Sequence, residues 1–202
     1  MASETSIANL ALIRIGATKQ IANLETERSA EAISIRTVFD NERDYVLRDF
    51  PWPFATAYVE LALVDGSSTA PVNYDWQYAY RYPSDCMFVR RIMGPNGRRD
   101  PNPPPFRVGR DSQGRLIYTN EANAEIEFTY AVTEPEEFDS MFVSMLAWKI
   151  ASVISPSQSR IKGMAETAMQ MYEIDKSKAA SRALNEQQQD QPLESEFVRA
   201  RT

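Results

Sequence analysis

The chain has 202 residues, of which 43% are hydrophobic and 25% charged, so it is long and apolar enough to bury its own core. Histidine is absent, which excludes His-based general-base catalysis, Ser-His-Asp triads and histidine-ligated metals, and the single cysteine excludes an intrachain disulfide. The net charge of −6 disfavours a general nucleic-acid-coating role, because the chain as a whole repels phosphates.

The first 54 residues predict two helices. Ser3 or Thr5 can cap the first helix, which Gly16 ends, and its shared apolar face is Ile7, Leu10 and Ala11. The second helix is expected over residues 29–50, where apolar residues recur at helical spacing: Ile35, Val38, Phe39, Val46 and Phe50. The following Phe-Pro-Trp-Pro-Phe segment (50–54) ends it, because proline lacks an N–H and restricts its predecessor.

Residues 55–133 predict strands. Short β-branched or aromatic runs separated by turn residues occupy 55–64, 86–92, 106–108, 116–118 and 125–132. Residues 111–114 are a candidate hairpin turn. In the last run, apolar and polar residues alternate, so we expect a strand with one solvent-exposed face: Ile126, Phe128 and Tyr130 inside, and Glu125, Glu127 and Thr129 outside.

The remaining residues predict two more helices. Thr133-x-x-Glu136 fits a capping box with Pro135 in the first turn, and the helix to about residue 154 is apolar nearly all round. Pro156 marks the start of a last helix to about residue 186, whose expected buried stripe is Ile161, Met164, Ala165, Ala168 and Tyr172.

The predicted fold class is therefore α+β. A bundle of about four helices (1–54 and 134–186) carries a β-rich insertion domain (55–133) between its second and third helices. The final segment (187–202) is polar and cannot bury a core of its own. It nevertheless carries Phe197 and Val198 beside Arg199 and Arg201, which fits either a docking tail or a frayed terminus with incidental apolar residues.

Two patterns suggest catalysis, and both have a simpler interpretation. Ser159-x-x-Lys162 has the spacing found in penicillin-binding enzymes but lacks their companion motifs. An acidic run could supply paired hydrolase carboxylates, but four acids at a helix start are better explained by the positive end of the helix dipole: Glu134, Glu136, Glu137 and Asp139. We expect no catalytic, cofactor-binding or metal-binding residue.

An arginine-rich segment spans residues 90–115, with seven arginines against two aspartates. Its arginines are candidates for contact between copies or with an acidic partner: Arg90, Arg91, Arg98, Arg99, Arg107, Arg110 and Arg115. Binding of DNA by this segment and a solvated strand face both remain open.

Aromatic residues alternate over residues 74–82, close to the only cysteine, Cys86. Such faces occur at interfaces, but they more often cover a join between a sheet and helices. We therefore predict a structural aromatic corner between the β-rich insertion and the bundle: Trp52, Tyr74, Trp76, Tyr78, Tyr80 and Tyr82.

Two aromatic-proline segments carry a family resemblance. Asp-Phe-Pro-Trp-Pro-Phe-Ala (49–55) and Trp-x-Tyr-Ala-Tyr-x-Tyr-Pro-Ser-Asp-Cys (76–86) resemble the head-to-tail adaptor proteins of short-tailed bacteriophages, also called tail tubular protein A. The likeness extends to the first helix ending in Ile-Gly, the late helices and the C-terminal Phe-Val-Arg-Ala-Arg, but not to the arginine-rich loops.

The resemblance implies a structural virion protein rather than an enzyme. It implies a homo-oligomeric ring, usually of twelve copies, bound to the portal protein, with the tail nozzle (tail tubular protein B) below. Genomic DNA would pass through the central channel during ejection without sequence-specific binding. The C-terminal segment with Phe197, Val198, Arg199 and Arg201 would reach the portal.

The expected location follows from the same reasoning. The N-terminal MASETSIANL lacks the basic and apolar regions of a signal peptide, and the apolar segment 142–154 is too short to cross a bilayer. We expect a protein made in the host cytoplasm and carried in the virion at the head-to-tail junction, without membrane contact. A tail-associated peptidoglycan hydrolase and a DNA-binding module using residues 90–115 are the alternatives.

Overall fold

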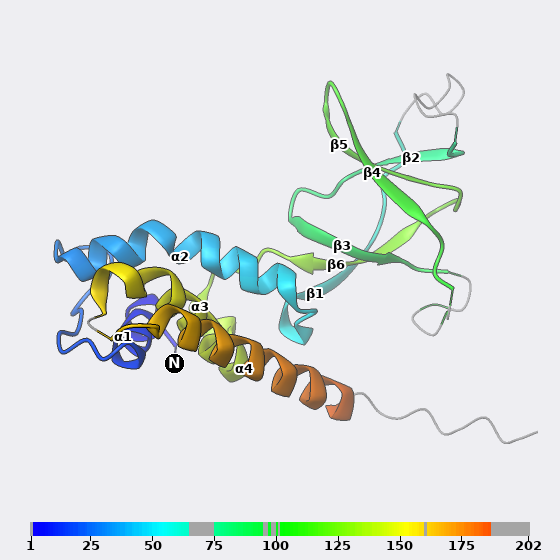
Figure 1. Cartoon of the computed structure of the whole chain (residues 1–202). Coiled ribbons are helices and arrows are strands. Elements are labelled where there is room, and N and C mark those ends of the chain that lie inside the picture. The colour runs from blue at the N-terminus through cyan, green and yellow to red at the C-terminus, as the bar shows by residue number, and fades with distance from the viewer. Residues whose placement is uncertain are drawn as a thin grey trace, which may run out of the picture. The chain divides into compact units, whose positions relative to one another are not determined.

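A computed structural model describes residues 2–64, 75–94, 97, 100, 102–159 and 161–186, and gives only the backbone of residues 183–186. The described residues form four α-helices and two three-stranded antiparallel sheets, and all six strands lie between α2 and α3 in the chain (Figure 1). The predicted α+β class, with β structure inserted between the second and third helices, is confirmed. No helix in this part of the chain is long and apolar enough to cross a membrane.

The chain divides into two compact units. The helical unit comprises Glu4–Val38 and the described residues from Ser140 onward, and the sheet unit consists mainly of Phe39–Asp139. The division falls within α2 (Ala30–Asp49), after Val38, so the second half of this helix belongs with the sheets.

Three helices form the body of the helical unit. α1 (Glu4–Arg14) packs on α3 (Ser140–Gln158), and α3 packs along α4 (Met164–Glu186) (Figure 1). α1 buries Ile7 and Ala11 as predicted, and Gly16 ends the turn after it with a φ of +74°, a conformation that glycine adopts without strain.

The predicted start of the third helix is wrong. Residues 133–139 do not continue into α3, because only Pro135–Glu137 form a single 3-10 turn, η2. Phe138 then adopts an extended backbone, its side chain is buried, and its ring lies 6.2 Å from that of Phe54. Burying this ring in the sheet unit takes the chain out of helical geometry until Ser140.

The predicted boundary at Pro156 is also wrong. α3 continues through Pro156 to Gln158, since a proline in the last turn disturbs few intrahelical hydrogen bonds. On α4, Ala168 and Tyr172 are fully buried as predicted, but Ile161 precedes the helix and is 57% exposed.

The sheet unit contains two small sheets. The first has the order β1-β6-β3, with β1 Thr56–Glu60, β6 Glu125–Tyr130 and β3 Cys86–Ile92. The second has the order β2-β5-β4, with β2 Tyr78–Arg81, β5 Gly114–Thr119 and β4 Phe106–Asp111. β4 and β5 form the predicted hairpin, in which Asp111 pairs with Gly114. The backbone N–H of Gln113 donates to the Asp111 carboxylate.

The predicted solvent-exposed face of β6 is wrong at two of its three residues, because only Glu125 is exposed. Glu127 and Thr129 are 9% and 1% exposed, whereas Tyr130, predicted inside, is 41% exposed. Arginines of the neighbouring strand β3 bind both buried polar side chains, so this face is covered at Glu127 and Thr129 despite its polar sequence.

Candidate functional site

Arg90 is a structural residue that joins β3 to the end of α2. Its Nε donates to the Thr129 hydroxyl at 2.8 Å, and its Nη2 donates to three carbonyl oxygens at 3.0–3.1 Å: Leu47, Arg48 and Phe50. A helix C-terminus leaves carbonyls unsatisfied and carries partial negative charge, so a guanidinium is well suited to this position. Burial lowers the pKa of Arg90 below its usual value, while Glu127 acts to raise it. This predicted contact residue is therefore occupied within the chain.

Arg91 is likewise engaged. Its Nε lies 3.0 Å from a carboxylate oxygen of Glu127, whose side chain is largely buried. Arg98 and Arg99 lie outside the described residues. Of the seven predicted contact arginines, those on the β4–β5 hairpin therefore remain as candidates for a surface: Arg107, Arg110 and Arg115.

The hairpin arginines are divided between its two faces. Arg110 and Arg115 lie directly opposite each other across β4 and β5, and both are exposed. The Arg115 guanidinium lies 3.6 Å from the centre of the Tyr82 ring, a cation–π distance. Arg107 pairs with Tyr118, so its side chain belongs to the other face. The hairpin therefore presents two adjacent cations on one face, which we call the arginine pair (Arg110 and Arg115).

A further arginine, which the sequence pattern did not indicate, connects this hairpin to β2. Arg81 of β2 binds the two Asp111 carboxylate oxygens, each at 2.9 Å, and donates to the Gln113 side chain at 2.6 Å. The Arg81 hydrogen bond lowers the pKa of Asp111, and the same bond raises the pKa of Arg81. The hairpin tip is thus tied to β2 by a bidentate contact.

The predicted aromatic corner is divided between two places. Trp52 is buried at the end of α2, where its indole N–H donates to the Val46 carbonyl at 3.0 Å and its ring lies 4.9 Å from that of Phe50. The tyrosines Tyr78, Tyr80 and Tyr82 belong instead to the core between the two sheets.

Tyr80 is the centre of this tyrosine row. It is 2% exposed, and its hydroxyl donates to the Glu121 carbonyl at 2.8 Å. Trp76 is half-buried, and Tyr74 lies outside the described residues. Tyr78, Tyr80 and Tyr82 therefore stabilise the sheet unit from within.

Tyr82 and Cys86 lie at the edge of the same core. Burial, followed by the hydrogen bond with Cys86, raises the pKa of Tyr82 to about 12. Burial also raises the pKa of the Cys86 thiol, which keeps it protonated and poorly nucleophilic at neutral pH.

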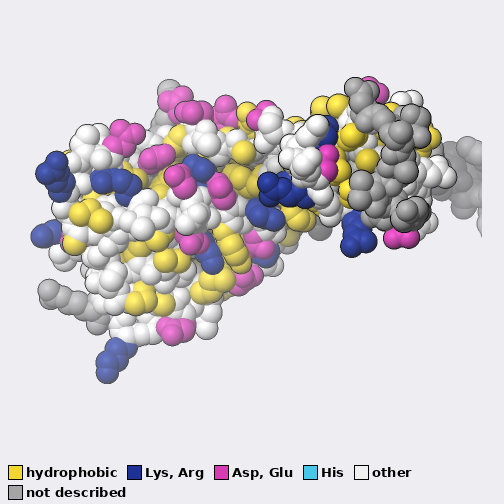
Figure 2. Space-filling view, turned by 90° about the horizontal axis from the view of Figure 1, so that it is seen from above, with side chains coloured by type: hydrophobic (Ala, Val, Ile, Leu, Met, Phe, Trp, Pro, Cys, Tyr) yellow, Lys and Arg dark blue, Asp and Glu magenta, His cyan; other side chains and the backbone are white. Residues whose placement is uncertain are grey.

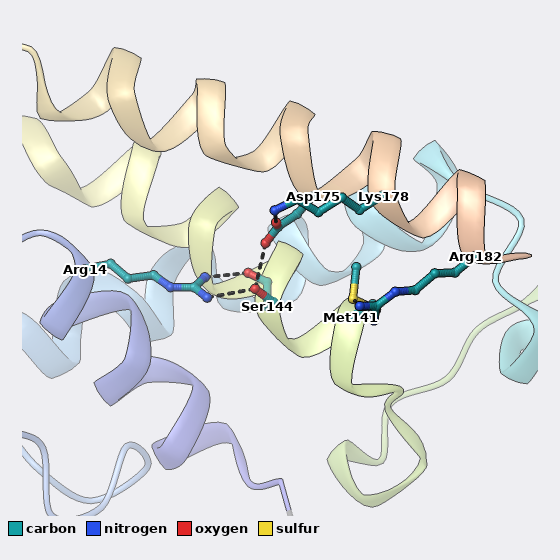
Figure 3. Close-up of polar contacts among 6 residues, drawn as sticks. All are labelled: Arg14, Met141, Ser144, Asp175, Lys178 and Arg182. Atoms are coloured by element: carbon teal, nitrogen blue, oxygen red, sulfur yellow. Dashed lines mark hydrogen bonds and ion pairs between the residues drawn. The ribbon is translucent and has the colours of Figure 1, made fainter.

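A polar network connects α1, α3 and α4 in the helical unit. Figure 3 shows Ser144 between Arg14 and Asp175. Arg14 donates to the Ser144 carbonyl at 2.5 Å and to its hydroxyl at 2.8 Å, and that hydroxyl donates to Asp175 at 2.8 Å. Lys178 lies 3.2 Å from the second oxygen of Asp175, and Arg14 stacks 4.1 Å above the Trp148 ring.

Burial of the Arg14 guanidinium lowers its pKa to about 10, and the charge of Asp175 acts in the opposite direction. The network was not predicted, although Asp175 interrupts the otherwise apolar stripe of Ala168, Tyr172 and Ala179. A buried acid in an apolar stripe is the sequence signal that indicates such a network. Each member has a partner here, so the network holds three helices in register.

The two patterns weighed as catalytic sites are surface features. The Ser159 hydroxyl donates to the Ile15 carbonyl at 3.0 Å and accepts from the Ile161 amide, which gives it a structural role, and Lys162 is exposed. Glu134, Glu136 and Glu137 are exposed around η2, outside the first turn of α3, so the helix dipole does not account for them.

On the face seen in Figure 2, acidic and basic side chains are interspersed over the helical elements. Within the described part of the chain, no group of three or more cysteine, aspartate or glutamate side chains is placed to hold a metal ion. The predicted portal-binding residues of the tail lie outside the described residues: Phe197, Val198, Arg199 and Arg201.

No protein-family model matches the chain, and no curated protein matches it either.

Proposed function

We propose that this protein is a head-to-tail adaptor, a structural virion protein that forms a ring between a portal and a tail nozzle. In this role the helical and sheet units build the ring wall, and packaged DNA passes through the central channel during ejection. The protein acts by assembly and not by turnover of a substrate.

The observation that carries the proposal is the position of the two aromatic-proline segments. Both occur in the adaptor-like order, and each occupies a junction of the fold: the segment around Trp52 connects α2 to β1, and the segment 76–86 contains β2 and leads into β3. Residues that are required to direct the chain through such junctions are the ones expected to persist among proteins that share a fold. The helix-helix-sheet-helix-helix order is consistent with the same resemblance.

The charge distribution supports the channel part of the proposal. The chain is acidic overall, and three of the described arginines of the sheet unit, Arg81, Arg90 and Arg91, are bound to neighbouring groups within it. A wall of this kind repels DNA weakly, which allows the duplex to slide instead of binding it.

The experiment is native mass spectrometry of the protein mixed with the portal ring from the same genome. A version ending at Gln191 lacks the proposed docking tail and serves as the comparison. Many copies on the portal with the full chain and few with the truncated chain support both the adaptor and its tail contact.

If both chains bind the portal equally, the adaptor proposal stands, and the portal contact lies on the helical or the sheet unit instead of the tail. If neither chain binds the portal at micromolar concentration, the adaptor proposal is wrong.

A further inference from the structure

Two pairs of like charges lie directly opposite each other in the sheet unit. Arg110 of β4 faces Arg115 of β5 in one sheet, and Glu60 of β1 faces Glu125 of β6 in the other. All four side chains are exposed. Like charges directly opposed across strands destabilise the pairing, and the chain retains two such pairs of opposite sign. We call the two opposed glutamates of β1 and β6 the glutamate pair (Glu60 and Glu125).

Neither pair is neutralised within the described part of the chain. Arg110, Glu60 and Glu125 form no ion pair there, and Arg115 contacts the Tyr82 ring. Neighbouring charges on the same sheets behave differently, since Asp111 binds Arg81 and Glu127 binds Arg91. The two like-charge pairs are therefore available to a partner molecule.

We propose that the arginine pair of one copy binds the glutamate pair of a second copy. Residues directly opposite in an antiparallel sheet have Cβ atoms about 4.5–5.5 Å apart, and this spacing applies to both pairs. Two guanidinium groups can thus meet two carboxylates one to one. Each contact adds two attractions that offset the two cross-strand repulsions, which persist in the complex.

The chemistry of the sheet unit favours a protein partner over a nucleic acid. Residues 39–139 contain ten arginines and no lysine. Arginine is enriched in protein interfaces and lysine is depleted, and the planar guanidinium matches a carboxylate in a bidentate geometry. The same residues include seventeen acids, which oppose binding of the unit to a phosphate backbone. Val108, 41% exposed and two positions from Arg110 on the same face, adds an apolar contact.

The contact has a definite symmetry consequence. The two pairs are different surfaces on different sheets, so every copy offers one of each. Two copies that exchange both pairs form a closed two-fold dimer, whereas copies that join head to tail make a heterologous contact, as the proposed ring requires. Repetition of such a contact produces a ring if the rotation closes and an open chain if it does not. This inference names a contact by which copies could join in the proposed ring. It rests on the proposed function, because that function requires copies of the chain to assemble with one another.

The test is a charge-swap experiment followed by sedimentation velocity at low ionic strength. One variant reverses the arginine pair (Arg110→Glu with Arg115→Glu), and the other reverses the glutamate pair (Glu60→Arg with Glu125→Arg). The wild-type protein is expected to self-associate, and each variant alone is expected to associate roughly 10- to 100-fold more weakly. Mixed in equal amounts, the two variants are expected to recover association, because each then meets a complementary partner.

Two matched controls separate this contact from general charge effects. Arg107→Glu makes the same change on the other face of the hairpin, and Glu136→Arg with Glu137→Arg reverses a different acidic surface. Both are expected to associate like the wild type. The assignment is contradicted if the arginine-pair variant regains association when mixed with the Glu136 and Glu137 variant but not when mixed with the glutamate-pair variant.

The variants are also designed to stay folded. Double reversals keep a like-charge pair in the same register, so the cross-strand repulsion is unchanged. Arg110→Glu alone places opposite charges across the hairpin, which favours its pairing, yet it is expected to weaken self-association. Thermal unfolding of each variant checks this point.

The outcomes separate this inference from the proposed function. A monomeric wild type at low ionic strength, or variants that associate normally, would overturn the contact even if the protein binds a portal. Loss of binding to a DNA duplex by the arginine-pair variant, without loss of self-association, would assign the surface to nucleic acid instead. A charge-swap recovery without portal binding would support the contact and leave the adaptor proposal wrong.

Discussion

Replacement of Arg90 by methionine tests whether one side chain connects α2 to the sheets. Methionine has a similar length and no charge, so Arg90→Met removes the bond to Thr129 and those to the three carbonyls at the end of α2. A hydrogen bond to a charged group contributes about 1.5–3 kcal/mol. Water can replace the guanidinium at the exposed Arg48 carbonyl but not at Thr129, which is 1% exposed.

Taking these together, we expect a loss of about 2–4 kcal/mol in the free energy of unfolding. For a chain of this size, that loss lowers Tm by roughly 5–15 °C. Arg90→Lys keeps the charge but cannot reach both groups at once, so about half of the loss is expected.

The assay is urea unfolding followed by tryptophan fluorescence. The indole of Trp52 binds the Val46 carbonyl beside the carbonyls that Arg90 contacts, so in a Trp76→Phe, Trp148→Phe background its emission reports on this end of α2. Arg107→Met is the matched control, because Arg107 is exposed and should change stability by less than about 0.5 kcal/mol. A cost below about 1 kcal/mol for Arg90→Met, with unchanged emission, would refute the reasoning.

Three further predictions concern packing, the helical network and pH. Trp52→Phe removes the indole hydrogen bond to Val46 from a side chain that is 2% exposed, so we expect a loss of about 1–2 kcal/mol in chemical unfolding, and an unchanged midpoint would contradict this. Ser144→Ala breaks the link between Arg14 and Asp175, so a double-mutant cycle with Asp175→Asn should give a coupling of about 0.5–3 kcal/mol, whereas additive effects would show that the two side chains act independently. The pKa of Tyr82 is raised to about 12, so its contribution to stability is present below its unfolded value near 10 and is lost as the pH rises from about 10 to 12. Tyrosine absorbance of the wild type and Tyr82→Phe should differ by one group that ionises near pH 12, and a difference near pH 10 would contradict the prediction.

The sequence predicted the elements that local patterns determine. The apolar spacing and the Pro-Trp-Pro breaker indicated α2, which the structure places at Ala30–Asp49, and the run 86–92 coincides with β3. The hairpin at 111–114 was predictable because aspartate and glycine occupy its two ends. In each case the information lies within a few residues of the chain.

The failures have a nonlocal cause. Glu127 and Thr129 looked solvent-exposed, but Arg91 and Arg90 of another strand cover them. The helix predicted from Thr133 begins only at Ser140, because the ring of Phe138 packs in the sheet unit. Such partners are distant in sequence, so periodicity cannot reveal them.

The candidate surfaces show the same limit. The sequence indicated an arginine-rich segment but not which of its members are free, and only the strand register places Arg110 opposite Arg115. The role of Arg90 in binding the end of α2 required the positions of three backbone carbonyls. Composition indicated an arginine-rich segment, and geometry divided its described members into residues bound within the chain and residues exposed on the hairpin.

The most direct test of the central claim is cryo-electron microscopy of the portal ring from the same genome, saturated with this protein. The adaptor account predicts a ring of added density on one end of the portal, in which each copy fits the four helices and the two sheets described above. A portal reconstruction without added density, at protein concentrations well above those of the portal, would contradict it.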